Sequence, residues 1–164
     1  MRPVLLVCGT RPEAVKLAPV ARALARRGAR WRLLAAGQHG PLLDQALRET
    51  GLRPHRRLRL MRRGQTPSQV AAEALRRLPA VLAAEAPSLV VVQGDTTLAA
   101  AAAWAASYAR LPVAHVEAGL RTGDPLDPHP EELNRLLIDR LAAVHFAPTE
   151  AAARNLRREG IAGA

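Results

Sequence analysis

The sequence predicts an α/β fold in which helices cover both faces of a doubly wound, mostly parallel sheet. Short runs of apolar, β-branched residues recur along the chain, which is typical of strands that are buried on both faces. Stretches with helix start and stop signals separate these runs. The 164 residues suffice for one domain with a proper core, but not for two ordinary domains. Such alternation favours parallel pairing with right-handed crossovers.

Five apolar runs are predicted to be strands. The first of them leads into Gly-Thr-Arg-Pro rather than into a small-residue cleavage site, so it is interpreted as a strand and not as a signal peptide. None approaches the roughly 20 residues of a membrane span, and no membrane partner is expected. The predicted strands are Val4–Val7, Trp31–Ala36, Leu89–Val92, Val113–Val116 and Val144–Phe146, with a further candidate near Leu58–Met61.

Helices are predicted between these strands from their end signals. A capping box with proline at the first helical position, an alanine-rich tract suited to close packing, and glycine or proline stops mark them. Predicted starts are Thr10–Glu13, Thr66–Pro67, Glu131 and Thr149, and predicted stops are Gly28, Pro87 and Gly160.

The net charge of +10 raises the question of a nucleic-acid partner. Six arginines fall between positions 53 and 63. Aromatic residues make up only 2% of the chain, which leaves little to stack on single-stranded bases, and no helix-turn-helix, zinc-knuckle or RNP-like pattern is present. Since Lys16 is the one lysine among 24 basic residues, the charge is interpreted as a solvated arginine-rich surface. No nucleic-acid partner is predicted.

The single cysteine bears on the cellular compartment. Cys8 lies within the first predicted strand and has no second cysteine with which to form a disulfide. A small core residue is the expected role. A reducing cytoplasm is the predicted location.

Ligands of doubly wound sheets bind beyond the carboxyl ends of the strands, where the strand order reverses. Segments that directly follow a predicted strand should therefore open on one edge of the sheet. Four segments qualify: Gly9–Lys16, Gly37–His39, Gln93–Thr97 and Glu117–Glu132.

The segment after the first strand predicts an anion site. Free backbone N–H groups and the positive end of the helix dipole would lie there, next to Arg11 and Lys16. Cations in the opening turns oppose the dipole, so an anionic partner would make their placement favourable. The alternative is a capped helix with two solvated charges. The segment is neither GxGxxG nor a Walker loop, so NAD and ATP motifs are absent.

Three carboxylates could meet at the same edge. Asp95 and Glu117 each follow a strand, and Glu131 begins a helix. Carboxylates crowded into a partly desolvated cleft acquire separated pKa values, which suits paired acid and base work. For Asp95, a simple N-cap is the alternative. No metal is expected, because the histidine spacing is loose and no DxD-like pair is present.

These motifs together resemble a known family. GTRPEAVKLAPV, GQH…LLDQAL, QGDTT, HVEAGLRTGD, PEELNR and HFAPTEAAARNL occur in the order and at nearly the intervals of the non-hydrolysing UDP-N-acetylglucosamine (UDP-GlcNAc) 2-epimerases. The resemblance covers essentially the whole chain. It implies that residues 1–164 form an N-terminal Rossmann-like domain, one half of a GT-B arrangement with the active site between the halves.

The resemblance also implies a reaction. These enzymes interconvert UDP-GlcNAc and UDP-ManNAc by eliminating UDP to give 2-acetamidoglucal and then adding it back, without a cofactor. By motif match, Asp95, Glu117 and Glu131 would be the catalytic carboxylates, with the residue that takes the C2 proton left open. Arg11 and Lys16 would bind the substrate near its diphosphate, and Asp95 and Glu117 would also contact the substrate.

The sequence departs from the family pattern in two places. It stops before the second, nucleotide-binding domain, so we expect the 164 residues to need that domain as a partner and to be inactive alone, and we expect the full-length enzyme to be a homodimer. Gln38 and His39 match a secondary, regulatory motif, but Gly40 and Pro41 replace its polar arginine and glutamine. A structural hydrogen bond is the alternative role for His39.

Two other functional classes remain open from the sequence. One is a different nucleotide-sugar enzyme of the same architecture, such as a glycosyltransferase or a hydrolysing epimerase. The other is a non-catalytic module that binds a nucleotide sugar or a partner domain.

Overall fold

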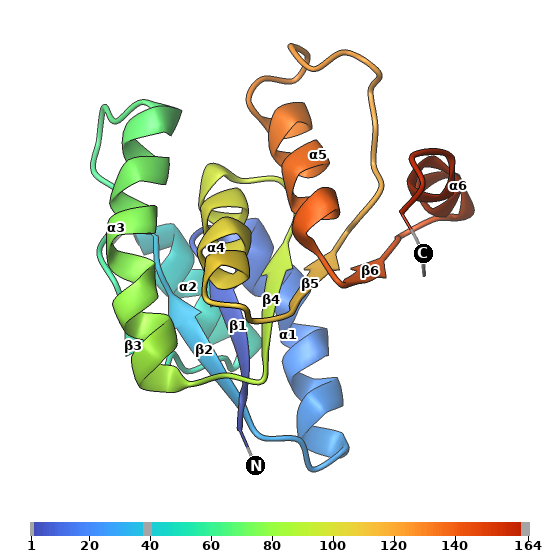
Figure 1. The fold of residues 1–164 in the computed structure, drawn as a ribbon. Coiled ribbons are helices and arrows are strands. Elements are labelled where there is room, and N and C mark those ends of the chain that lie inside the picture. The colour runs from blue at the N-terminus through green and yellow to red at the C-terminus, as the bar shows by residue number, and fades with distance from the viewer. Residues whose placement is uncertain (1, 38–40, 162–164) are drawn as a thin grey trace.

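One parallel sheet organises the molecule. The computed structural model describes residues 2–37 and 41–161. Six strands follow the order β3-β2-β1-β4-β5-β6, and each neighbouring pair is parallel (Figure 1). The chain therefore builds outward from β1 to β3 and then returns to β4, which puts the topological switch point between β1 and β4. The strands are β1 Val4–Cys8, β2 Trp31–Ala35, β3 Arg56–Arg57, β4 Leu89–Gln93, β5 Val113–Val116 and β6 Val144–Phe146.

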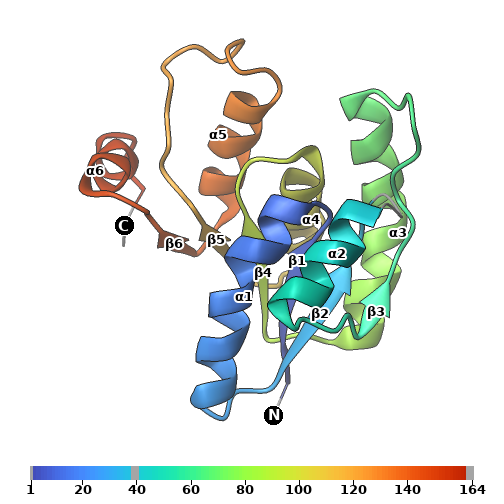
Figure 2. The ribbon, with the colours of Figure 1, turned by 180° about the vertical axis from the view of Figure 1, so that it is seen from behind.

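Helices cover both faces of this sheet. Helices α3, α4 and α5 lie on one face, and α1 and α2 lie on the other, as the two views together show (Figures 1 and 2). Helix α6 lies beyond β6, at the end of the sheet. This is the doubly wound, Rossmann-like arrangement that the sequence predicts. The helices are α1 Arg11–Arg26, α2 Pro41–Thr50, α3 Pro67–Glu85, α4 Thr97–Tyr108, α5 Glu131–Leu141 and α6 Glu150–Arg158.

The core has two layers because successive strand residues point to opposite faces. Leu5 and Val7 pack with α3 and α4, whereas Leu6 and Cys8 pack with α1 and α2. Cys8 is fully buried and free, which confirms the predicted core role. Burial, reinforced by the nearby carboxylate of Glu13, raises the pKa of the Cys8 thiol to about 12.

The predicted strand ends are confirmed to within one residue, except at β3. The candidate near Leu58–Met61 is wrong, because the strand is Arg56–Arg57. Leu58 and Leu60 are buried in the layer that contains α3. Their alternation therefore reflects packing of a loop rather than a strand in the sheet.

The helix signals operate largely as predicted. Thr66 and Gln69 exchange hydrogen bonds at the start of α3, and the Thr149 hydroxyl accepts from Ala152 N at the start of α6. Gly28 and Gly160 follow α1 and α6 with positive φ angles of 68° and 71°. The alanine-rich tract is α4, which packs between α3 and α5 over the sheet. No helix in the described part of the chain is long and apolar enough to cross a membrane.

Candidate functional site

The candidate site lies where β1, β4 and β5 end, at the switch point of the sheet. Gly94 N donates to Val116 O at 2.9 Å, which joins the ends of β4 and β5. On the other side of β1, a Cβ on Gly37 would lie 1.9 Å from Gly9 O. Glycine is therefore required at position 37, because the segments after β1 and β2 are in backbone contact.

Lys16 and Glu117 meet at this edge. The Lys16 ammonium donates to both Glu117 carboxylate oxygens at 2.7 Å, from residues 101 positions apart in sequence. The Gln93 amide, at the end of β4, also donates to Glu117. The lysine side chain is 48% exposed and the glutamate 25%, so the pair is open to a ligand while its orientation is fixed by three donated hydrogen bonds.

Glu117 has an unusual backbone conformation. Its φ is +74°, in the left-handed region that non-glycine residues rarely adopt. Two hydrogen bonds from the backbone N–H groups of Glu117 and Ala118 to Phe146 O hold this turn against β6. Such strain persists only where the surroundings enforce it, and it is typical of functional sites.

The start of α1 differs from the predicted anion site. The buried Glu13 carboxylate accepts hydrogen bonds from Gly9 N at 2.8 Å and Thr10 N at 2.6 Å. It also accepts from the Thr10 and Thr96 hydroxyls. Burial raises the pKa of Glu13, and these hydrogen bonds oppose that rise. The prediction of free N–H groups is therefore wrong for Gly9 and Thr10, whose N–H groups donate to the chain's own carboxylate.

Asp95 pairs with α5 instead of capping α4. Its carboxylate accepts from Arg135 Nε at 2.9 Å and Arg135 Nη2 at 2.6 Å. Its carbonyl accepts from the Asn134 side chain at 2.8 Å. The N-cap of α4 is Thr96, whose hydroxyl accepts from Ala99 N at 3.0 Å. The N-cap alternative for Asp95 is therefore excluded, and one oxygen of Asp95, Oδ2, accepts both guanidinium hydrogen bonds.

Glu131 and Glu132 begin α5 but differ in environment. Glu132 is buried and accepts from Thr122 N and Arg135 Nη1. Burial would raise the pKa of Glu132, but these donors outweigh it and lower the pKa. Glu131 is half-buried, and within residues 2–37 and 41–161 its carboxylate has no hydrogen bond or ion pair.

The structure thus links the predicted carboxylates in two groups. Glu117 is joined directly to Lys16, and Asp95 is joined through Arg135 to the first turns of α5, where Glu131 lies. No hydrogen bond connects Asp95, Glu117 and Glu131 to one another within the described part of the chain.

Arg11 is the fifth predicted residue at this edge. Its exposed side chain lines a cavity of about 400 Å³ between the start of α1 and the start of α2. Gln38 and His39, the predicted regulatory residues, lie outside the described residues. The other lining residues are Gly9, Thr10, Pro12, Pro41, Leu42, Leu43 and Met61.

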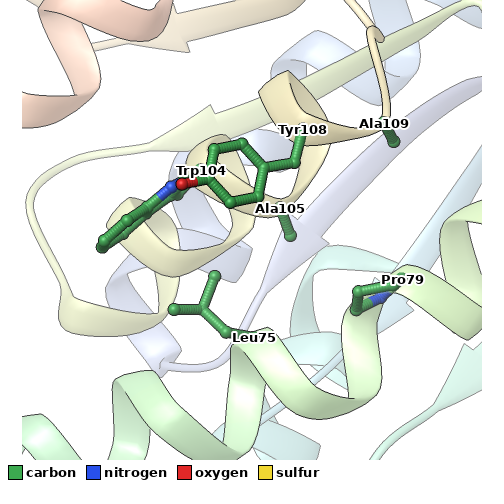
Figure 3. A pocket seen from close by; sticks show the side chains of 6 residues that line it. All are labelled: Leu75, Pro79, Trp104, Ala105, Tyr108 and Ala109. Carbon is green, nitrogen blue, oxygen red and sulfur yellow. The ribbon is translucent and has the colours of Figure 1, made fainter.

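A different cavity lies away from the site. It occupies about 340 Å³ between α3 and α4, and its lining is apolar (Figure 3). It contains no predicted site residue. Trp104 and Tyr108 stand one helical turn apart on α4 beside it, with 37% and 78% of their surface exposed.

Several residues at the edge were not predicted as site residues from the sequence. Gln93 holds Glu117 and Arg135 holds Asp95. Glu13 bonds to the start of α1 and to Thr96, and His115 pairs with Asp139 behind them. Four of these lie inside the family motifs, so the motifs were a signal for them. For Asp139, which is 24 residues from His115, no sequence pattern indicates the contact.

The described residues contain no group of three or more His, Cys, Asp or Glu side chains that could hold a metal ion. Carboxylates beside cations, as in the pairs of Glu117 with Lys16 and Asp95 with Arg135, suit proton transfer and stabilisation of developing negative charge.

The chain is similar in sequence to proteins of one enzyme family. The family model described as UDP-N-acetylglucosamine 2-epimerase matches residues 22–164. The UDP-N-acetylglucosamine 2-epimerase of Escherichia coli K12 is 46% identical over 160 residues, which is 97% of this chain and 43% of that protein. The enzyme of Yersinia pestis is 47% identical, over 96% of this chain and 42% of its own length.

Solved structures agree with the sequence comparison. UDP-GlcNAc 2-epimerase from Neisseria meningitidis, bound to UDP-GlcNAc, has a TM-score of 0.93 at 41% identity, over 97% of this chain and 43% of that chain. The Methanocaldococcus jannaschii enzyme in complex with UDP-GlcNAc and UDP has a TM-score of 0.90 at 40% identity, over 97% and 44%. A spinosyn rhamnosyltransferase, at TM-score 0.53 and 22% identity over 84% of this chain and 41% of that chain, shares the fold alone.

The chain spans less than half the length of the curated relatives that it matches.

Proposed function

This chain belongs to the UDP-N-acetylglucosamine 2-epimerase family, and we propose that it is the acid–base half of an enzyme that interconverts UDP-GlcNAc and UDP-ManNAc. The observation that carries the proposal is Glu117, held by Lys16 and Gln93 at the open carboxyl edge of the sheet. It puts a partly exposed carboxylate beside a cation at the switch point, where this class of fold binds its ligands.

The proposed reaction needs only proton transfer and leaving-group stabilisation. A carboxylate takes the proton from C2 of the sugar, the C1–C2 double bond forms, and the C1–O bond breaks with its electron pair going to UDP. In the second half, UDP oxygen attacks C1 and a proton is delivered to the opposite face of C2. Electrons balance without an oxidant or reductant, so no cofactor is invoked, and each proton step requires a positioned acid or base.

Asp95, Glu117 and Glu131 are the proposed acid–base and positioning carboxylates. The fixed partners of Glu117 and Asp95 support this, because a proton acceptor must be held within hydrogen-bond reach of its proton. Glu131, which has no partner among the described residues, is the least constrained of the three. Which carboxylate removes the C2 proton stays open.

Arg11 and Lys16 are the proposed cations near the diphosphate. Since Glu13 occupies two backbone N–H groups of the α1 terminus, we assign stabilisation of the leaving group to these side chains. The exposed ammonium of Lys16 would then lie between Glu117 and the diphosphate, so proton transfer and leaving-group departure would occur side by side.

The complete enzyme is proposed to contain a second, nucleotide-binding domain. The relatives are more than twice as long as this chain, and two of the similar structures were solved with nucleotide or nucleotide sugar bound. We also propose that the full-length enzyme is a cytoplasmic homodimer. The exposed Trp104 and Tyr108 beside the α3–α4 cavity offer an apolar face for such pairing, and α4 carries no charged residue that would oppose a second basic copy.

Complementation tests this proposal. The purified chain alone should convert no UDP-GlcNAc, because a single wall neither excludes water nor binds the whole nucleotide. Adding the separately expressed C-terminal half of a relative, or fusing it to this chain, should produce UDP-ManNAc, detected by chromatography. The C-terminal half alone is the control. Robust turnover by the 164 residues alone would refute the need for a second domain, and inactivity of every fused form would refute the epimerase proposal.

A further inference from the structure

A buried histidine lies directly behind the candidate site. His115 is in β5, two residues before Glu117, and its side chain is completely buried. It bonds to neither Lys16 nor Glu117, so the proposed chemistry gives it no task. A fully buried imidazole with both nitrogens bonded requires an explanation, since burial of a polar group is costly unless its partners are well placed.

Both partners of the His115 ring are hydrogen-bond acceptors. Nε2 lies 2.7 Å from the carbonyl oxygen of Gly94, which has no proton to give. Nδ1 lies 2.5 Å from Oδ1 of Asp139. The other Asp139 oxygen faces the Arg121 guanidinium and accepts from Gly119 N, which favours the carboxylate form. The ring must then donate from both nitrogens, as only an imidazolium does.

The surroundings balance the charge of an imidazolium. Arg121 Nη1 lies 2.8 Å from the second Asp139 oxygen, and Arg121 also forks onto Glu159 at 2.7 and 2.8 Å. Two cations and two carboxylates therefore form one neutral cluster, which is the condition under which buried charges are tolerated. From β6, His145 approaches Asp139 through the backbone carbonyl, at 2.8 Å, and not through the carboxylate.

This cluster ties together the two segments that carry the predicted carboxylates. The Gly94 carbonyl belongs to the turn of Asp95, and Asp139 also accepts from Gly119 N at 3.1 Å, two residues after Glu117. Glu117 has a φ of +74°, a conformation that a non-glycine residue keeps only with support from its surroundings. His115, which leads into the segment of Glu117, bonds directly to the turn of Asp95 and is linked through Asp139 to Gly119 N.

We propose that His115 is a positioning residue whose doubly protonated ring holds the turn of Asp95 in register with the segment of Glu117. The effect of His115 on catalysis rests on the proposed function, whereas the double protonation of its ring does not. Removing the ring would free the Gly94 carbonyl and one oxygen of Asp139. The predicted effect is a loss of catalytic alignment rather than of substrate affinity.

The protonation state can be measured on the 164-residue chain itself. In long-range ¹H–¹⁵N spectra of ¹⁵N-labelled protein at pH 7, both His115 nitrogens should carry protons and exchange slowly with water. His129, on the exposed loop before α5, provides a comparison within the same sample. A His115 ring with one unprotonated nitrogen would overturn the proposal, whatever the activity of the protein.

The positioning role is tested by His115→Gln in the fused, active enzyme. We expect kcat to fall by about 100-fold while KM changes by less than about twofold. His55→Gln, at the junction with β3, is the matched control and should leave kcat unchanged. An unchanged kcat for His115→Gln, or a rise in KM that accounts for the whole loss, would contradict the proposal. If the fused wild type is inactive, the proposed function fails. The ¹H–¹⁵N spectra still test whether both nitrogens of His115 are protonated.

Discussion

Replacing Glu117 by glutamine is expected to lower kcat of the fused enzyme by about 1,000-fold, which lies within the range measured for loss of a general acid or base. Glutamine has nearly the same shape, but its amide can neither take a proton from C2 nor return one to it, whichever of the two steps Glu117 serves. It also presents an NH₂ group to Lys16 or Gln93, where the carboxylate accepts from both. Steady-state kinetics at saturating UDP-GlcNAc would measure the effect.

The matched control for this variant is Glu150→Gln. Glu150 is also a glutamate in an ion pair, with Arg157, but it is 70% exposed on α6. Its substitution should leave kcat within about twofold of wild type, as surface ion pairs contribute little. Equal kcat values for the Glu117 and Glu150 variants would remove Glu117 from the chemistry and favour a non-catalytic binding module.

Gly119→Ala should cause the largest loss of stability. Gly119 has a φ of +81°, and a Cβ there would lie 2.3 Å from Ala152 O and 2.8 Å from Leu156 Cγ. The backbone of α6 would have to move to relieve the overlap. Combining left-handed strain with overpacking, we expect the free energy of unfolding to fall by roughly 2–5 kcal/mol, measured by urea denaturation of the 164-residue chain.

Gly123→Ala separates the strain of a positive φ from the overlap with α6. Gly123 has a similar φ of +89°, but a Cβ at this position would have no described atom within 4 Å. This variant should lose only the strain contribution, about 1–2 kcal/mol. If both variants lost the same free energy, close packing of α6 against the loop after β5 would not be what requires glycine at position 119.

The fold was predictable because its signals are local. Strand runs such as Val113–Val116 and capped starts such as Thr66–Pro67 depend on neighbouring residues alone. Strand β3 is the exception. Arg56–Arg57 carries no apolar signal, because a two-residue edge strand needs only backbone groups, whereas the apolar Leu58 and Leu60 pack without pairing.

The site was predictable in its members but not in its contacts. Topology indicates that Asp95 and Glu117 end adjacent strands, so their shared edge followed from the order of elements. That Lys16 would bond to Glu117, or Arg135 to Asp95, depends on side-chain directions across 101 and 40 residues, which no local pattern encodes. Glu13 shows the same limit, since the capping box predicts its bond to Thr10 N but not its bonds to Gly9 N and to the Thr96 hydroxyl.

The most direct test of proton chemistry at the sugar is solvent exchange. The fused enzyme should be incubated with UDP-GlcNAc in deuterium oxide, and the recovered UDP-sugars examined by NMR. Removal and return of the C2 proton by carboxylates at this edge predicts deuterium at C2 of UDP-ManNAc and of recovered UDP-GlcNAc, with little in the Glu117→Gln variant. Turnover that leaves C2 free of deuterium would contradict proton chemistry at this edge.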